Sequence, residues 1–353
     1  MREQNLPLSI NILRTFDAAA NRAREGLRVV EDGLRFALDD RHLTEICKQI
    51  RHDLAAAMRG VPWPDRLAAR ETQSDVGTNI ATSQERQRAD GADVMTANLL
   101  RVQEALRSLE EYGKTFDPEM AARLEQLRYR VYTLHRAIDI TQRNTERLAH
   151  AQLYVLLDGR ATLAEFQVLA QSLISAGVDL IQLRDKRLPD RALLDRARWL
   201  REWTHGTESL FIMNDRPDLA ELSQADGVHI GQDELTVKDA RTIVGPRSLI
   251  GVSTHSIEQA RQAVLDGADC IGCGPTFPSN TKQFEHFPGV EFLKVVAAEI
   301  RLPAFAIGGV NLENIGLVKA AGIRRVAESG VVVGAREPAE AVKRLKAELK
   351  TEK

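Results

Sequence analysis

Carboxylate side chains follow two neighbouring apolar runs in the second half of the chain. Asp215 comes after the run 210–213, and Asp233 and Glu234 come after the run 227–230. Oxygen ligands of this type suit Mg²⁺, which is typically held by one or two protein carboxylates together with substrate phosphates. We therefore predict a Mg²⁺ site formed by Asp215 with either Asp233 or Glu234.

Groups that can bind phosphate follow other apolar runs of the same half. They are the cations Arg184, Lys186 and Lys282 and the hydroxyl and amide side chains of Ser279, Asn280 and Thr281. Two glycine-containing turns, Gly308-Gly309 and Ser329-Gly330, expose backbone N–H groups that can bind a further phosphate. Together these residues predict a site for a metal-bound diphosphate and a second, monophosphorylated ligand.

The elements that must position these residues alternate regularly from about residue 151 onward. Short β-branched runs predict strands at 153–157, 180–183, 210–213, 227–230, 249–252, 270–273, 304–307 and 325–327. Amphipathic helical patterns lie between these runs. Eight strand–helix units predict an α/β fold of the (β/α)8 TIM-barrel type, whose active site lies at the carboxyl ends of the strands. The chemically active residues above follow these predicted strands.

The first half of the chain has a different pattern. Helical periodicity is present at 9–38, 42–58, 93–114 and 117–143, without strand-like alternation. Gly and Pro residues cluster between 60 and 91, in a long connection of the kind that often carries function. We predict an all-α domain at 1–147 followed by the barrel at 148–353.

A charged pattern occurs twice in the helical half. Arg22, Glu25, Arg28 and Glu31 recur 79 residues later as Arg101, Glu104, Arg107 and Glu110. Residues three and four apart lie on one helix face, so one copy alone would be typical of a solvated, ion-paired face. The repetition favours two helices that face each other across a polar seam or cleft.

Composition excludes several classes of protein. The 48 Lys and Arg residues nearly balance the 50 Asp and Glu residues, which argues against a dedicated binder of nucleic acid or membrane surfaces. No apolar run reaches the length of a membrane span, and the N-terminus lacks a signal-peptide pattern. Three cysteines do not form a disulfide framework, and Cys270 and Cys273 lie in an apolar run that favours barrel packing. We expect a cytoplasmic protein, and the sequence leaves open whether it forms a homo-oligomer.

The second half resembles thiamine phosphate synthase over essentially all of 151–353. The matching stretches are Ile181-Gln-Leu-Arg-Asp-Lys186, Asn214-Asp215-Arg216, Asp226-Gly-Val-His-Ile-Gly-Gln232, Gly251-Val-Ser-Thr-His255, Gly274-Pro275 through Lys282, and Ala306-Ile-Gly-Gly-Val310. This family joins hydroxymethylpyrimidine diphosphate to a thiazole phosphate and releases pyrophosphate and thiamine monophosphate. The resemblance implies a dissociative reaction, in which the bond to diphosphate breaks before the thiazole nitrogen attacks.

The resemblance also implies residue roles. It assigns the pyrimidine to Gln182 and Asn214, and Mg²⁺ to Asp215 and the acid that follows Gln232. It assigns the diphosphate to Arg184, Lys186, Asn214, Ser253 and Lys282. It assigns the thiazole phosphate to Ser279 and Thr281 and to the backbone at Gly309, Glu328 and Ser329.

Two positions depart from the family pattern. The acid pair is Asp233-Glu234, whereas the second member is usually Asp, so either residue can be the metal ligand. Glu328 stands where the family usually has an apolar residue, and a carboxylate aimed at a phosphate would repel it. We expect Glu328→Val to leave activity intact or to lower the KM for the thiazole phosphate.

The helical half resembles an N-terminal domain that is fused to this enzyme in some bacteria. The matching stretches are Asn21 through Asp32, Asp75-Val-Gly77 and Ala97 through Tyr112. The resemblance implies that this domain phosphorylates hydroxymethylpyrimidine phosphate, with the repeated Arg/Glu faces and the 60–92 connection as its site. A structural or dimerising domain is the alternative.

Two other functions remain for the barrel. A thiazole tautomerase on the same fold would not need the diphosphate and Mg²⁺ residues, so Arg184, Lys186, Asp215 and Lys282 argue against it. A non-catalytic, ligand-sensing protein is supported only by the departure at Glu328.

Overall fold

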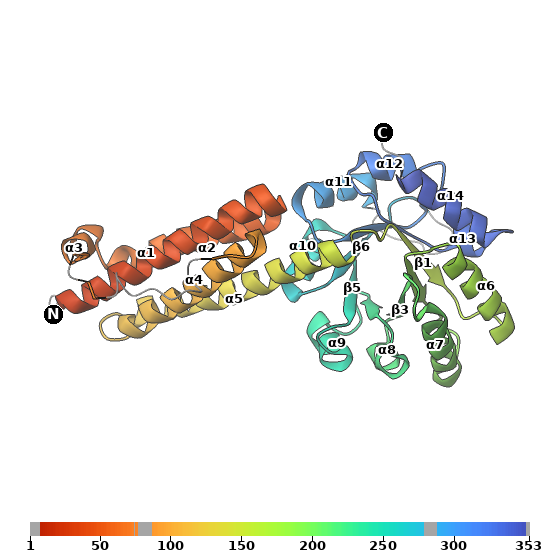
Figure 1. Cartoon of the computed structure of the whole chain (residues 1–353), viewed down its shortest axis with the longest axis horizontal. Helices are drawn as coiled ribbons and strands as arrows, with labels where there is room; N and C mark the ends of the chain where they lie inside the picture. Colours follow the sequence, from red (N-terminus) through yellow and green to blue (C-terminus); the bar gives the residue numbers. More distant parts are fainter. Residues whose placement is uncertain (1–7, 74, 77–86, 279–287, 351–353) are drawn as a thin grey trace. The chain divides into compact units, whose positions relative to one another are not determined.

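The computed structural model describes residues 8–73, 75–76, 87–278 and 288–350 (Figure 1). Contacts divide the chain into two units, Met1–Asp139 and Ile140–Lys353. The division falls inside one long helix, α5 (Pro118–Arg147). In the described ranges, none of the helices combines the length and the apolar character needed to span a membrane.

The N-terminal unit is helical, as predicted. Its elements are α1 (Ile10–Gly33) with a π-helical turn (Leu34–Leu38), α2 (Arg41–Ala57) with a 3-10 turn (Met58–Gly60), α3 (Trp63–Ala68), α4 (Gly91–Gly113) and the first part of α5. Side chains before the helices cap them: Asp40 accepts from the Leu43 N–H at 2.8 Å, and Asp90 accepts from the Asp93 N–H at 2.8 Å. The short α3 lies inside the connection that the sequence pattern left without structure.

Helices α1 and α4 pack closely because a glycine faces the contact. A Cβ atom at Gly26 would lie 2.6 Å from Val102 Cγ2 and 3.1 Å from the Asn98 carbonyl oxygen. No side chain fits at these distances, so only glycine permits this separation of the two helices.

The repeated charged pattern forms two equivalent ion-pair clusters. Glu31 and Glu110 are both buried, with 3% and 1% of their surface exposed. Glu31 pairs with Arg28 at 3.2 Å and with Arg51 of α2 at 2.9 Å. Glu110 pairs with the corresponding Arg107 at 2.7 Å and with Arg128 of α5 at 2.9 Å. Each glutamate therefore ties its own helix to the helix that follows it.

The C-terminal unit is the predicted barrel. Its parallel strands close in the order β1-β2-β3-β4-β5-β6-β7-β8. They are β1 (Leu153–Leu157), β2 (Leu180–Leu183), β3 (Leu210–Asn214), β4 (Gly227–Ile230), β5 (Leu249–Thr254), β6 (Cys270–Cys273), β7 (Ala304–Ile307) and β8 (Val326–Glu328). The last strand starts one residue later than expected and takes in Glu328.

Helices separate the strands of the barrel. They are α6 (Leu163–Ser175), α7 (Asp190–Thr204), α8 (Pro217–Ser223), α9 (Val237–Val244), α10 (Ile257–Asp266), α11 (Gly289–Glu299), α12 (Ile315–Ala320), α13 (Gly330–Val333) and α14 (Pro338–Lys350). Thr162 and Glu165 form the predicted capping box at the start of α6. The four-residue α13 is too short for a helical period, and the sequence pattern did not predict it.

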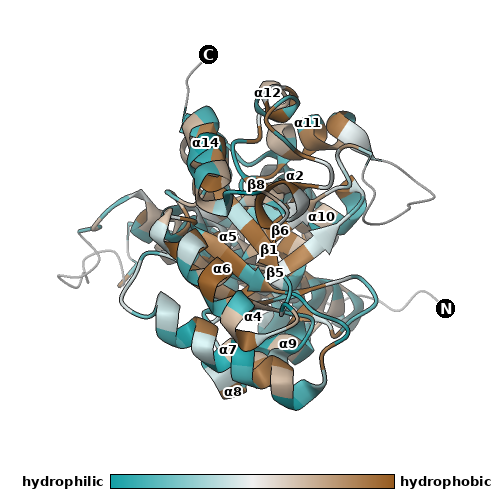
Figure 2. Cartoon of the chain, turned by 90° about the vertical axis from the view of Figure 1, so that its right-hand side faces the viewer, coloured by the Kyte–Doolittle hydropathy of each residue, from teal (hydrophilic) through white to brown (hydrophobic). Residues whose placement is uncertain are grey.

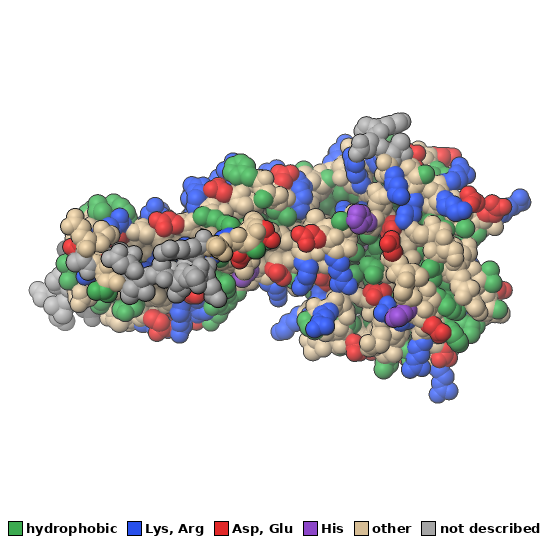
Figure 3. Space-filling view, viewed as in Figure 1, with side chains coloured by type: hydrophobic (Ala, Val, Ile, Leu, Met, Phe, Trp, Pro, Cys, Tyr) green, Lys and Arg blue, Asp and Glu red, His purple; other side chains and the backbone are tan. Residues whose placement is uncertain are grey.

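The barrel core is apolar, and the view along it shows hydrophobic residues on the strands β1, β5 and β6 (Figure 2). A buried cluster contains Tyr154, Leu180, Ile212, Leu249, Cys270 and Phe305. Burial raises the pKa of the thiols of Cys270 and Cys273 to about 12. Both cysteines are therefore neutral packing residues of β6. On the face shown in Figure 3, Lys and Arg side chains are interspersed with Asp and Glu.

Candidate active site

The strand ends bring three predicted site residues together. The Lys186 ammonium lies 3.0 Å from an oxygen of Asp215 and 3.6 Å from an oxygen of Glu234. These residues follow β2, β3 and β4, so the contact joins three neighbouring loops. The hydrogen bond from Lys186 to Asp215 and the negative charge of that carboxylate raise the pKa of Lys186, which keeps it protonated. The cluster places one cation between two carboxylates.

Asp215 is held in an unusual backbone conformation. Its φ is 58°, in the left-handed region, which is uncommon for residues other than glycine and is enriched at functional sites. Its N–H donates to the His229 carbonyl oxygen at 2.8 Å, and its carboxylate accepts from the Asn214 amide at 2.7 Å. These bonds orient Asp215 toward Lys186 and bring the predicted pyrimidine residue Asn214 to the same place.

Asp233 does not join this cluster. Its side chain is exposed, and it has no ion pair or hydrogen bond to any residue that the structure describes. The geometry thus separates the two acids that the sequence could not distinguish, because only Glu234 faces Lys186.

Ser253 is held by two hydrogen-bond contacts at the end of β5. Its Oγ lies 3.0 Å from Nε2 of His229, and its carbonyl oxygen accepts from the Gln232 amide at 2.6 Å. Burial lowers the pKa of His229 to about 4, although the charge of Asp215 opposes this effect. A Cβ atom at Gly251 would lie 2.3 Å from the His229 ring, so this glycine makes room for the histidine. The neutral ring therefore orients the Ser253 hydroxyl.

Gln182 lies inside the barrel with only 2% of its surface exposed. Its amide nitrogen donates to the Tyr154 hydroxyl at 2.6 Å. Tyr154 was not predicted as a site residue, because a tyrosine in an apolar strand run is indistinguishable from a packing residue in the sequence. Tyr154 fixes the orientation of the amide that the family resemblance assigns to the pyrimidine.

The loop after β2 is shaped by Asp185. Its carboxylate accepts from the backbone N–H groups of Gly159, Arg187 and Leu188 at 2.8–3.1 Å. Arg184, immediately before it, has an exposed side chain that makes no hydrogen bond or ion pair with the described residues. Arg184 and Lys186 therefore extend from a loop whose backbone is fixed.

The end of β1 also contributes to this face, which the sequence analysis missed. Arg160 has φ 52° and donates to the Val333 carbonyl oxygen of α13 at 2.8 Å. The only sequence signal was a Gly-Arg pair directly after the first strand. Arg160 thus connects the loop after β1 to α13, which follows β8.

The two predicted phosphate turns differ in their backbone geometry. Gly308 and Gly309 have φ values of 94° and 65°, and a Cβ atom at Gly309 would lie 2.6 Å from the Pro278 carbonyl oxygen. Ser329 precedes α13 and its carbonyl oxygen accepts from the Val333 N–H at 2.7 Å. The first turn therefore requires glycine, whereas the contact at Ser329 is made by its backbone alone.

Glu328 points its carboxylate at the same end of α13. It is 7% exposed and accepts from the Val331 N–H at 3.0 Å. Burial raises the pKa of Glu328, although the N–H groups of Val331, Ser329 and Gly330 oppose the rise. The side chain thus occupies N–H groups that the resemblance would offer to a phosphate.

Four predicted residues lie outside the described part of the chain. They are Ser279, Asn280, Thr281 and Lys282. The described start of their loop is anchored, because the Thr276 hydroxyl donates to the Ile307 carbonyl oxygen at 3.0 Å.

The acidic groups near Lys186 fit a metal that takes few protein ligands. Within the described ranges, no cluster of three or more His, Cys, Asp or Glu side chains is placed to hold a metal. Asp215 and Glu234 both contact one cation, which shows that the two carboxylates converge. Two oxygen donors suit Mg²⁺, which completes its shell with water and substrate oxygens, and do not suit a closed structural zinc site.

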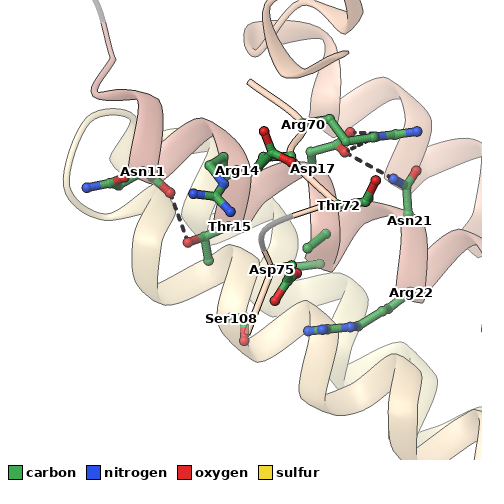
Figure 4. Close-up of a pocket in the computed structure, with 13 residues that line it drawn as sticks. Asn11, Arg14, Thr15, Asp17, Asn21, Arg22, Arg70, Thr72, Asp75 and Ser108 are labelled. Carbon is green, nitrogen blue, oxygen red and sulfur yellow. Dashed lines mark hydrogen bonds and ion pairs between the residues drawn. The ribbon is translucent and has the colours of Figure 1, made fainter. Parts of the chain in front are cut away.

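The N-terminal unit has its own pockets. One, of about 550 Å³, is lined by Arg14, Arg22 and Arg70 together with Asp17 and other polar residues (Figure 4). Another, of about 410 Å³, lies between α1, α2 and α3. The 60–92 connection lines both pockets with its described residues. Glu31 and Glu110 line neither pocket, so these members of the repeated pattern act in helix packing.

Comparison with known proteins gives matches to both units. The thiamine monophosphate synthase family matches residues 153–332, and the ThiD2 family matches residues 14–137. The thiamine-phosphate synthase of Rhodopirellula baltica is 46% identical over 92% of this chain and 89% of its own length. That of a Synechocystis strain is 42% identical over 96% of both chains. A solved structure of thiamine phosphate pyrophosphorylase from Pyrococcus furiosus matches with a TM-score of 0.51 and 30% identity, over 57% of this chain and 96% of that one.

Proposed function

The chain belongs to the thiamine-phosphate synthase family and is a transferase, and we propose that its barrel joins hydroxymethylpyrimidine diphosphate to thiazole phosphate. The observation that carries this proposal is the contact of Lys186 with both Asp215 and Glu234 at the strand ends. A thiazole tautomerase would have no use for this cluster, because its reaction has no diphosphate leaving group.

The proposed reaction breaks one bond and forms another. The C–O bond between the pyrimidine methylene and the diphosphate breaks, and the electron pair leaves with the diphosphate. The resulting pyrimidine-methyl cation is attacked by the thiazole nitrogen, which gives thiamine monophosphate and pyrophosphate. Charge develops on the leaving group, so the enzyme gains most by stabilising that charge in a preorganised site.

The chain's residues have distinct roles in this scheme. Arg184, Lys186 and Lys282 would bind the diphosphate, and the Ser253 hydroxyl, held by His229, would donate to it. Gln182, oriented by Tyr154, and Asn214 would hold the pyrimidine.

Mg²⁺ fits the same site. Asp215 and Glu234 would hold it, with Asp233 as the alternative to Glu234. When bound, Mg²⁺ would neutralise charge on the diphosphate.

Pyrophosphate release tests the synthase proposal. We expect the purified chain to release pyrophosphate only when both substrates and Mg²⁺ are present, and to stop when EDTA is added. Chromatography of pyrophosphate and thiamine monophosphate in quenched samples measures this without a metal-dependent coupling enzyme, and omission of the thiazole phosphate is the control. Absence of release from a folded chain would contradict the proposal.

Ser279 and Thr281, together with the backbone at Gly309, Glu328 and Ser329, would bind the thiazole phosphate. The carboxylate of Glu328 gives this part of the site a pH dependence. Its pKa is raised, so the carboxylate gains its charge only as pH rises through that higher value. We expect the KM for thiazole phosphate to rise over this range. Glu328→Gln keeps an acceptor for the Val331 N–H without the charge, so its KM should be several-fold lower at high pH and should vary less with pH. Equal KM–pH profiles for the two proteins would show that Glu328 does not face the phosphate.

We also propose that the N-terminal unit phosphorylates hydroxymethylpyrimidine phosphate. The match of residues 14–137 to the ThiD2 family supports a separate function for this unit. Transfer of the γ-phosphate of ATP to the phosphate monoester would give ADP and the diphosphate that the barrel consumes.

The full chain with Asp215→Asn isolates this activity, because its barrel reaction is disabled. We expect this variant to form ADP and hydroxymethylpyrimidine diphosphate from ATP and the monophosphate, as measured by chromatography of the products. Folded protein that forms neither product would favour the structural interpretation of the N-terminal unit.

A further inference from the structure

The smaller N-terminal pocket is strongly cationic. It has a volume of about 410 Å³ and is lined by Arg24, Arg59 and Arg66, by Trp63, and by apolar side chains such as Leu54 and Met58. No carboxylate is among its lining residues, all of which the structure describes. Pockets of this size hold small molecules, and three guanidinium groups without an acid attract an anion.

Arg66 is the most buried of these cations. It is 8% exposed, and its Nε donates to the Val61 carbonyl oxygen at 3.1 Å. Its guanidinium carbon lies 5.3 Å from the centroid of the Trp63 ring. A guanidinium carries five N–H donors, and burying its charge without an ionic partner is costly. Arg128, the other buried arginine of this unit, is paired with Glu110, whereas Arg66 has no ion pair in the described part of the chain.

Asp17 is the carboxylate whose charge acts on the pKa of Arg66, and it is already paired with another arginine. Asp17 accepts two hydrogen bonds from Arg70, at 2.6 and 3.0 Å, and one from Asn21 at 3.3 Å (Figure 4). Burial lowers the pKa of Arg66, the charge of Asp17 opposes this effect, and the positive charges of Arg24 and Arg70 add to it. Arg24, Arg59 and Arg66 thus share a pocket whose positive charge is not neutralised by the protein.

We propose that this pocket binds the phosphate of a small phosphorylated molecule. Arg24, Arg59 and Arg66 surround the phosphate, and Trp63 with the adjoining apolar wall contacts the rest of the ligand. Guanidinium groups bind phosphate oxygens through charge-assisted, frequently bidentate hydrogen bonds. The inference concerns binding alone and holds whether or not the N-terminal unit transfers a phosphoryl group.

Trp63 provides a local reporter. The chain has three tryptophans, and the other two, Trp199 and Trp203, stack on each other on α7 with ring centroids 6.0 Å apart. In the full chain carrying Trp199→Phe and Trp203→Phe, Trp63 is the sole source of tryptophan fluorescence. We expect a saturable change in its emission on titration with inorganic phosphate, and none with potassium chloride at equal ionic strength. If the double variant does not fold, the difference between the wild-type chain and Trp63→Phe supplies the same signal.

Substitution of the pocket arginines tests whether they bind the phosphate. Arg24→Ala with Arg59→Ala removes two exposed side chains and should raise the phosphate Kd at least tenfold. Arg123→Ala, which removes an exposed arginine of α5 that lines neither pocket, should leave the Kd unchanged. A chloride response equal to that of phosphate, or an unchanged Kd in the double arginine variant, would overturn the proposal.

A parallel titration with ATP distinguishes the two sources of phosphate. Tighter binding of ATP than of inorganic phosphate, lost in the double arginine variant, identifies a nucleotide polyphosphate as the ligand. Weaker binding of ATP identifies a phosphate monoester. If the chain binds phosphate near Trp63 but forms no ADP, this inference is supported and the kinase proposal is contradicted. If the chain forms ADP but phosphate does not change the Trp63 emission, only this inference is contradicted.

Discussion

The Asp215→Asn variant is expected to lose on the order of 10² to 10³ in kcat/KM for thiamine monophosphate formation, the usual cost of removing one group that stabilises charge in a transition state. Asp215 is fixed by the Asn214 amide at 2.7 Å and lies 3.0 Å from Lys186. Asparagine keeps the size of the side chain but removes the charge that would hold Mg²⁺. Steady-state rates over a range of Mg²⁺ concentrations measure the loss.

The acid pair after β4 supplies a matched comparison for this experiment. Glu234 lies 3.6 Å from Lys186, whereas the Asp233 side chain makes no hydrogen bond or ion pair with that lysine or with any other described residue. We therefore expect Glu234→Gln to raise the Mg²⁺ concentration needed for half-maximal rate and to lower kcat/KM, and Asp233→Asn to behave like the wild type. Each change removes one charge from the same loop, so net charge cannot explain a difference between them.

Two results would contradict this assignment. A large loss in Asp233→Asn with a normal Glu234→Gln would place the metal on the other acid. Wild-type rates in Asp215→Asn would remove the cluster from catalysis altogether. Thermal unfolding of all three variants serves as the control for folding.

The architecture of the barrel was predictable because its strands are short apolar runs that repeat eight times. Periodicity detects such runs but not side-chain contacts between neighbouring strands, so the hydrogen bond from the Gln182 amide to the Tyr154 hydroxyl was missed. The four-residue α13 and the six-residue α3 were missed because they are too short to show a helical period. The side chain of Glu328 caps α13, so its orientation depended on an element that the sequence did not reveal.

The repeated charge pattern shows a different limit of sequence reasoning. Its spacing predicted two helices with a shared polar seam or cleft. In the structure, Glu31 and Glu110 are ion-paired with arginines of their own and the following helix. A single sequence gives the spacing along each helix but not the helix that supplies the second arginine, so it cannot separate a ligand site from a packing contact.

This packing role leads to the second large effect, which concerns stability. Glu110→Ala is expected to lower the free energy of unfolding of the N-terminal unit by about 3 kcal/mol, because it leaves a buried cation without its partner. The cation is Arg128, whose side chain is only 9% exposed. The loss corresponds to a fall of roughly 10 °C in the unfolding midpoint of a unit of this size. Scanning calorimetry of the full chain measures it.

Two other glutamates, Glu31 at the equivalent position of α1 and the neighbouring Glu111, test whether burial of the partner sets the loss of stability. Glu31→Ala should cost less, because its partners Arg28 and Arg51 are 52% and 21% exposed and can be rehydrated. Glu111→Ala removes a carboxylate that is 46% exposed, and should change the stability by less than about 1 kcal/mol. Equal effects of all three substitutions would show that burial of the partner does not set the cost.

Acid provides an independent check on the same carboxylate. Burial alone would raise the pKa of Glu110, but hydrogen bonds from Lys114 and Arg128 outweigh it, and the pKa is lowered. A group whose pKa is lower in the folded state stabilises the fold above its unfolded pKa, about 4.3 for Glu, and loses this contribution as pH falls through the folded value. The difference in stability between the wild type and Glu110→Ala should therefore be greatest near neutral pH and shrink below about pH 4. A difference that stays constant in acid would mean that the loss of side-chain packing, and not the charge of Glu110, accounts for the effect.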